Sequence, residues 1–221
     1  MLTDAAWSTV AGLRHGFLDA ADCPNAPDWA LVVGAPVALP RQVHGTVVVE
    51  ALTIGVDRPE ADAVTTRPDQ PLAGILTADC VPVLLLDRRQ RAAAAVHAGW
   101  RGAATGVLEA AVTFLRARHQ VCATDLEALV GPAIGPCCYR VGSEVRTAFE
   151  ERTGACTAVA WDPRPDGLFV DLRVAARALL QNVGVAHVTL GGGCTRCDPR
   201  FHSFRRDGER AGRQLSFIGW S

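Results

Sequence analysis

Short apolar runs, several of them rich in β-branched residues, follow one another through the first half of the chain and are bounded by Gly, Pro or charged residues. Runs of this length and composition are typical of buried strands. They lie at Thr46–Leu52, Leu72–Thr77, Val81–Asp87 and Arg91–Ala98. The last run is rich in Ala, which favours helix, so it indicates a strand less strongly than the others. The chain is therefore expected to contain a buried sheet.

Helical patterns follow in the second half of the chain. Gly102–His119 has apolar residues at helical spacing, and its last residues include basic side chains that suit a helix C-terminus. Two further segments, Ser143–Arg152 and Asp171–Val183, are also predicted to be helices. The second of them begins with Asp171, a favourable N-cap, and is followed by Gly184, a common helix stop.

Further strands are predicted at Leu126–Val130, His187–Leu190 and Gln214–Ile218. Asp162–Gly167 (DPRPDG) is interpreted as a Pro-rich surface loop within the domain. A chain of 221 residues, 49% of them hydrophobic, can bury one substantial core but is too short for two comfortable domains. We therefore expect a mixed α/β fold, with one domain spanning residues 1–221.

Charge and hydropathy argue against several classes of partner. The net charge is −1 and the chain has no Lys, so it lacks the dense basic tract that binds nucleic acid. No run approaches the roughly 18 apolar residues of a membrane span, and Met1–Val10 has no basic, export-type segment. We therefore expect a cytoplasmic protein with neither a nucleic-acid nor a membrane partner.

The chain has eight cysteines, and we expect them to be reduced. No export signal precedes them, and Cys137 is next to Cys138, where a disulfide would be strained. Cys194 and Cys197 form a CxxC, which is interpreted as incidental because no second CxxC accompanies it. Cys137 and Cys138 are interpreted as packing residues of a turn rich in Gly and Pro.

Three residues at junctions of predicted strands carry donor atoms for a metal. His44 precedes a strand, Cys80 lies between two strands, and His97 lies where a strand leads into a helix. Functional side chains concentrate at such junctions, although a single Cys or His more often only packs in a core. One thiolate and two imidazoles suit Zn²⁺ and leave a fourth position open for chemistry.

The motifs around these residues are similar to those of the YfiH-like family, whose members are often called multicopper polyphenol oxidases or laccase-domain proteins. The matching segments are RQVHG at 41–45, ADAVTT at 61–66, LTADCVPVLLLD at 76–87, AAVHAGWRG at 94–102, GPAIGPCCYRVG at 131–142 and CTRCDPRFHSFRRDGERAGRQLSFIGW at 194–220. They run in order across nearly the whole chain. The resemblance implies an α/β/β/α layered sandwich with mixed sheets, and it implies zinc ligands at His44, Cys80 and His97.

The activity that the resemblance implies is zinc-dependent phosphorolysis of purine nucleosides. Adenosine, inosine, guanosine or 5′-methylthioadenosine would react with phosphate to give the free base and ribose 1-phosphate. Adenosine would also be deaminated. The expected partners are therefore small molecules, a nucleoside and phosphate.

Deamination needs an activated water molecule and a group that moves protons. Asp79, adjacent to Cys80, is the candidate for proton transfer, and these two residues form the predicted catalytic pair. The alternative for Asp79 is an acceptor that orients a zinc ligand or caps a strand end.

Phosphorolysis needs a site for a dianion, and bidentate arginine suits one. The candidates in the matched motifs are Arg41, Arg101, Arg205 and Arg206. Arg41 and Arg101 are preferred because they are closest in sequence to the ligands, whereas a structural ion pair is the alternative for the other two. Backbone N–H groups beside Gly99 and Gly102 are a further alternative for anion binding.

Three other classes of function compete. A metal-free Cys–His hydrolase or amidase, acting on cell-wall peptide precursors, would use Cys80 as nucleophile and His97 as base, and would not require His44. A copper polyphenol oxidase is less expected, because the chain has six His and only Met1 as methionine. A purely structural zinc site would need a fourth protein ligand, for which the candidates are Cys137, Cys138 and Cys194.

Overall fold

A six-stranded mixed sheet is the centre of the fold. In the computed structural model, which describes residues 1–23, 28–55 and 57–221, its strands lie in the order β12–β8–β6–β7–β4–β3. Their bounds are His187–Leu190 (β12), Glu127–Val130 (β8), Val81–Asp87 (β6), Ala92–Ala98 (β7), Ala63–Thr66 (β4) and Val48–Glu50 (β3). β6 and β7 are antiparallel, whereas β12 is parallel to β8 and β3 is parallel to β4. The Ala-rich run is therefore a strand, as predicted.

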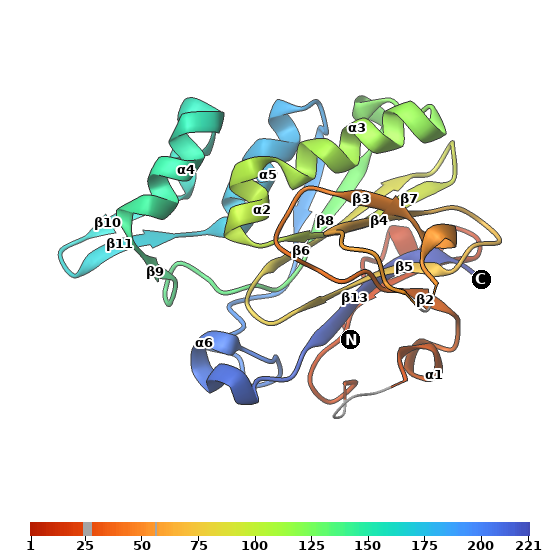
Figure 1. Cartoon of the computed structure of the whole chain (residues 1–221), viewed down its shortest axis with the longest axis horizontal. Helices are drawn as coiled ribbons and strands as arrows, with labels where there is room; N and C mark the ends of the chain where they lie inside the picture. The colour runs from red at the N-terminus through yellow and green to blue at the C-terminus, as the bar shows by residue number, and fades with distance from the viewer. Residues whose placement is uncertain (24–27, 56) are drawn as a thin grey trace.

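Two smaller sheets accompany this one. A four-stranded sheet has the order β1–β13–β5–β2, with bounds Leu13–Phe17 (β1), Gln214–Trp220 (β13), Leu72–Thr77 (β5) and Val37–Ala38 (β2). A three-stranded sheet has the order β10–β11–β9, with bounds Trp161–Arg164 (β10), Gly167–Val170 (β11) and Arg140–Val141 (β9). Figure 1 shows β10 and β11 as a ribbon that extends from the rest of the molecule beside α4.

The alternation of side chains along β6 explains the layers. Val83 and Leu85 point into the core that the helices cover, whereas Leu84 and Leu86 point into the core between the two larger sheets. Because both faces are buried, β6 is apolar throughout instead of alternating with polar residues. Helices α2 to α5 cover one face of the assembly, and α1 lies on the opposite side with α6 (Figure 1). The α/β/β/α arrangement is confirmed.

The helices of the described residues have the bounds Trp29–Val33 (α1), Trp100–Thr105 (α2), Val107–His119 (α3), Ser143–Thr153 (α4), Leu172–Asn182 (α5) and Phe204–Asp207 (α6). The Asp171 carboxylate accepts the N–H groups of Arg173 and Val174, so the predicted cap of α5 is confirmed. None of the helices in the part of the chain that the structure describes is long and apolar enough to cross a bilayer.

The structure corrects three sequence predictions. Gly102–His119 is not one helix, because Gly106 has φ of 104° and separates α2 from α3. In the run Thr46–Leu52 only Val48–Glu50 is strand, and a 3-10 turn follows at Ala51–Thr53. Asp162–Gly167 is not a surface loop but the turn and flanking residues of the β10–β11 hairpin. Pro163 was misleading, because it lies in β10, an edge strand, where a residue without an N–H group is tolerated.

Candidate metal centre and its cavity

The structure brings His44, Cys80 and His97 together. Their donor atoms all lie within 4.8 Å of one another, and Cys80 Sγ lies 3.9 Å from His44 Nε2. The two imidazole rings meet edge to face, with centroids 4.8 Å apart. Zinc bonds of ordinary length would hold a nitrogen and a sulfur about 3.5 Å apart in a tetrahedron, so the donors lie near the spacing that a zinc ion requires.

Strand register explains how residues so far apart in sequence meet. Ala63 of β4 pairs with Val96 of β7, so Asp62 lies opposite His97, whose N–H donates to the Asp62 carbonyl at 2.7 Å. Pro82 of β6 pairs with His97 from the other side, which places Cys80 at the same end of the sheet. The candidate centre is therefore built at the ends of neighbouring strands.

The Asp62 carboxylate organises this end of the sheet, although the sequence analysis gave it no role. Its side chain is fully buried and accepts the backbone N–H groups of Val43, His44 and Gly45 at 3.2, 2.9 and 2.7 Å. Oδ1 also lies 2.7 Å from His97 Nδ1, which must donate because an ionised carboxylate only accepts. This bond leaves Nε2 of His97 available for a metal, as in other carboxylate–histidine–metal arrangements.

The charges in the cluster favour a thiolate. Burial alone would raise the pKa of the Cys80 thiol, but hydrogen bonds and charge from His44 and His97 lower it to about 6. Burial would lower the pKa of His97, but Asp62 and the Cys80 thiolate raise it to about 9. Burial likewise opposes ionisation of Asp62, yet His97 and the N–H groups of the turn hold its pKa below the usual range. A buried thiolate is the form that binds zinc.

Two backbone features allow the three donors to approach one another. His44 has φ of 61°, and Asp79, next to Cys80, has φ of 81°, a region that non-glycine residues seldom occupy. A Cβ at Gly99 would lie 2.7 Å from His44 Cδ2 and 3.2 Å from Cys80 Sγ. Residue 99 therefore has to be glycine for the imidazole and the thiolate to pack against this backbone. Strained residues of this kind cluster at functional sites.

The three donors line a cavity of about 650 Å³, a volume that suits a small organic ligand. Its walls include the aromatic rings of Trp100, Tyr139 and Phe204. Burial, more than any other cause, raises the pKa of Tyr139 to about 12, so its phenol remains a hydrogen-bond donor at neutral pH. The cavity therefore combines flat apolar surfaces with polar groups near the triad.

Three of the four predicted arginines line this cavity: Arg41, Arg101 and Arg205. The Arg101 guanidinium lies 4.4 Å from the centroid of the Trp100 ring, and that of Arg205 lies 5.2 Å from the Tyr139 ring. Arg41 forms an exposed ion pair with Glu60. These side chains give the cavity a cationic wall.

Arg206 is not among the residues that line the cavity. Its guanidinium donates to the carbonyl groups of Phe201 at 2.8 Å and Thr195 at 3.2 Å, and it pairs with Asp207 at 2.9 Å. This geometry matches the structural role that was the alternative for Arg206.

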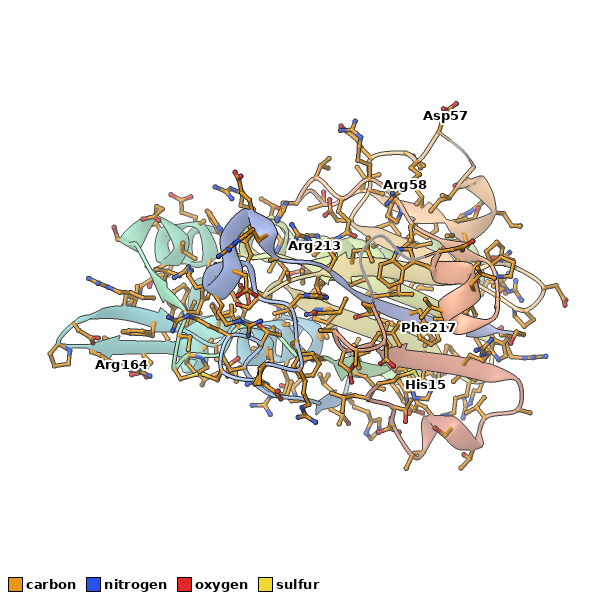
Figure 2. The ribbon with its side chains drawn as sticks, turned by 90° about the horizontal axis from the view of Figure 1, so that it is seen from below. His15, Asp57, Arg58, Arg164, Arg213 and Phe217 are labelled. Carbon is orange, nitrogen blue, oxygen red and sulfur yellow. The ribbon has the colours of Figure 1, made fainter. Side chains whose placement is uncertain are left out.

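Two arginines that the sequence analysis did not select, Arg58 and Arg213, also line the cavity and lie on the same side of the molecule (Figure 2). Arg58 donates to the carbonyl groups of Leu39 and Pro40, each at 2.7 Å. No local pattern marks either arginine, because their proximity depends on how distant segments pack.

Asp79 lines the cavity, but both of its carboxylate oxygens already accept hydrogen bonds. Oδ1 accepts from the Thr195 hydroxyl at 2.6 Å, and Oδ2 accepts from the backbone N–H of Arg205 at 2.6 Å. The geometry therefore makes Asp79 an acceptor, as in the alternative role, but its donors belong to neighbouring loops and not to a zinc ligand. Proton transfer by Asp79 stays a prediction.

The structure also corrects the interpretation of four other cysteines. Cys137, Cys138, Cys194 and Cys197 form a second group of potential ligands, separate from His44, Cys80 and His97. The CxxC and the adjacent pair therefore lie side by side, which the sequence analysis did not expect. Within residues 1–23, 28–55 and 57–221, no fourth Cys, His, Asp or Glu joins the triad, so its fourth position stays open.

Comparison with known proteins agrees with this fold. A family model described as multi-copper polyphenol oxidoreductase laccase matches residues 25–221. The sheets and helices define a mixed α/β fold, and the Cys/His group of this chain lies at the ends of its strands. The chain is a member of the multi-copper polyphenol oxidoreductase laccase family, which includes the YfiH-type proteins.

Curated relatives carry a different functional name. A Xylella fastidiosa protein named purine nucleoside phosphorylase is 40% identical over 206 residues, which covers 89% of this chain and 74% of the relative. The Escherichia coli protein named purine nucleoside phosphorylase YfiH is 36% identical, covering 93% of this chain and 78% of the relative.

Solved structures agree with the fold. A Neisseria meningitidis protein superposes with a TM-score of 0.82 at 33% identity, covering 95% of this chain and 94% of its own. YlmD from Geobacillus stearothermophilus gives a TM-score of 0.84 at 25% identity, covering 96% and 93%.

Proposed function

We propose that the protein is a zinc-dependent purine nucleoside phosphorylase that also deaminates adenosine. The observation that carries the proposal is that one cavity contains the Cys/His triad, aromatic walls and several arginines. Its substrates would be adenosine, inosine, guanosine or 5′-methylthioadenosine together with phosphate. The names of the curated relatives support this class of reaction.

The cavity residues suit the two parts of such a substrate pair. Trp100, Tyr139 and Phe204 offer flat surfaces against which a purine base can stack. Arg41, Arg101 and Arg205 offer guanidinium groups for the phosphate dianion. In this proposal the arginines bind and orient phosphate while the aromatic residues hold the base.

His44, Cys80 and His97 would hold the zinc ion, with Asp62 fixing the orientation of His97. Zinc at this centre would supply Lewis-acid chemistry, which lowers the pKa of water and polarises substrate oxygens. Copper fits less well despite the family description, since a multicopper enzyme needs a further cluster of imidazoles. In the part of the chain that the structure describes, the groups able to hold a metal contain only two histidines.

The deciding experiment incubates purified, metal-quantified protein with adenosine, with and without phosphate, and separates the products. Adenine formed only when phosphate is present supports phosphorolysis, and inosine formed in both reactions supports deamination. Zinc-loaded protein that forms neither product would contradict the proposal.

One observation favours a second candidate, a Cys–His hydrolase or amidase for cell-wall peptide precursors. The His97 imidazole contacts both the Cys80 thiol and the Asp62 carboxylate, as a catalytic base contacts its nucleophile and its orienting carboxylate in cysteine hydrolases. His44 distinguishes the two candidates, because a hydrolase of this kind does not require it whereas the metal centre does.

Alkylation of Cys80 by iodoacetamide tests which state the thiolate occupies. In metal-free protein the thiolate predominates above its pKa of about 6, so the alkylation rate should rise through pH 6 and then level off, instead of rising near the ordinary value of 9.0. Zinc should slow alkylation at neutral pH, and a chelator should restore it. Mass mapping of the Cys80 peptide measures the rate.

The matched variant is His97→Ala, which removes the imidazolium that stabilises the thiolate. Its alkylation midpoint should move to higher pH. If zinc and a chelator leave the alkylation rate of Cys80 unchanged in the unmodified protein, the metal centre at this residue is refuted and the hydrolase candidate is favoured.

A further inference from the structure

The four cysteines outside the triad lie on two loops that meet beside the cavity. Cys137 and Cys138 are in the loop between β8 and β9, and Cys194 and Cys197 are in the loop between β12 and α6. The Thr195 N–H donates to the Ala133 carbonyl at 3.0 Å, which joins the two loops by their backbones. The four side chains therefore converge from two segments that lie far apart in sequence, since Cys137 and Cys197 are separated by 60 residues.

The distances between the sulfur atoms suit a metal more than a disulfide. Each of the four Sγ atoms lies within 4.8 Å of the others, and Cys197 Sγ is 3.6 Å from Cys137 Sγ and 3.3 Å from Cys138 Sγ. A disulfide would bring two sulfur atoms to about 2.0 Å, and all four thiols are free. Zinc with four thiolates at ordinary bond lengths holds its sulfur atoms about 3.8 Å apart.

Hydrogen-bond donors contact two of the four sulfur atoms, as donors do in metal–thiolate sites. The Gly135 N–H donates to Cys194 Sγ at 3.2 Å, and Arg196 Nη1 lies 3.4 Å from Cys138 Sγ. Within the CxxC, the N–H groups of Cys197 and Asp198 both donate to the Cys194 carbonyl, at 3.2 and 3.0 Å, which forms a tight turn. The Gly135 N–H and the Arg196 guanidinium, which contact sulfur, compensate part of the negative charge that four thiolates and one divalent ion carry together.

We propose that Cys137, Cys138, Cys194 and Cys197 bind a zinc ion of their own, which is structural and distinct from the centre at His44, Cys80 and His97. Four thiolates fill a tetrahedral site and leave no position for substrate, so this ion would not take part in the reaction. Soft thiolate ligands favour zinc over magnesium, calcium or manganese. Binding releases the protons of those thiols that are still protonated.

The position of this cluster gives the ion a structural task. Cys138 precedes Tyr139, which lines the cavity, and Thr195 lies between the two cysteines of the CxxC and donates to Asp79 Oδ1 at 2.6 Å. The Ile134 N–H donates to the Asp79 carbonyl at 3.0 Å. A metal that holds the two loops together would therefore fix one wall of the cavity without touching the substrate.

Metal content tests the proposal on the full-length chain purified under reducing conditions. Native mass spectrometry and elemental analysis of the unmodified protein should find two zinc ions per chain. Cys197→Ser should lose one of them, whereas Cys122→Ser, a substitution of an exposed cysteine outside the cluster, should retain both. Cys138→Ser is a second variant of the cluster, and circular dichroism verifies that each variant is folded.

Cobalt replacement separates the two metal sites. The strong sulfur-to-cobalt absorption of a four-thiolate site should persist in His97→Ala and disappear in Cys197→Ser. That outcome would support the structural site even if the triad binds no metal, so the failure of one proposal is distinguishable from the failure of the other. Equal zinc content and equal cobalt spectra in Cys197→Ser and the unmodified chain would overturn the inference, as would iron in place of zinc or a disulfide within the cluster.

Discussion

Replacing His97 with alanine is expected to lower the rate of phosphate-dependent adenine release by more than about a hundredfold. The substitution removes one of the three donor atoms that lie within 4.8 Å of one another, and it also leaves the buried Asp62 carboxylate without its imidazole partner. Zinc affinity should fall together with activity. Product separation and elemental analysis on the same preparation measure both effects.

The control is His187→Ala, which removes an exposed imidazole on β12, away from the candidate centre. This variant should retain the zinc content and the rate of the unmodified protein. Full activity in a folded, zinc-depleted His97→Ala protein would show that the reaction does not depend on this centre.

Asp62→Ala is expected to have the second largest effect, on stability as well as on metal binding. Three backbone N–H groups and His97 Nδ1 would lose their acceptor in a fully buried position. We expect the free energy of unfolding to fall by about 3–5 kcal/mol and the zinc affinity to fall about 10–100-fold. Chemical denaturation and competition with a metal chelator measure the two quantities.

Asp87→Ala provides the matched control, because Asp87 is also a buried carboxylate of the central sheet. Its Oδ1 accepts the N–H groups of Arg89 and Gln90 at the end of β6 opposite Cys80. This variant should lose stability while keeping its zinc affinity. A folded Asp62→Ala protein that binds zinc as tightly as Asp87→Ala would refute the orienting role of Asp62.

Much of the fold could be predicted from the sequence, because its signals are local. β6 and β7 are apolar on both faces, and Asp171 and Gly184 bracket a helix that the structure places at Leu172–Asn182. Local signals were misleading where a neighbouring element changed their meaning. Pro163 suggests a loop, yet it lies in an edge strand that does not need its N–H group.

The candidate site was only partly predictable. His44, Cys80 and His97 attracted attention because of their donor atoms and their places at strand ends. Asp62 has no comparable local signal, since its role follows from contacts with residues that lie 17 to 35 positions away. Likewise, Arg58 and Arg213 are identified only by the shared cavity that they line.

The sequence by itself determined which strands are buried on both faces, where α4 and α5 begin, and which side chains carry thiolate and imidazole donors. Only the tertiary structure decided which of those donors meet. Cys137 lies beside Cys197 at a separation of 60 residues, and His97 lies beside Asp62 at a separation of 35. The reason is physical: residue type and periodicity act over a few positions, whereas strand register and loop packing are set by contacts across the whole chain.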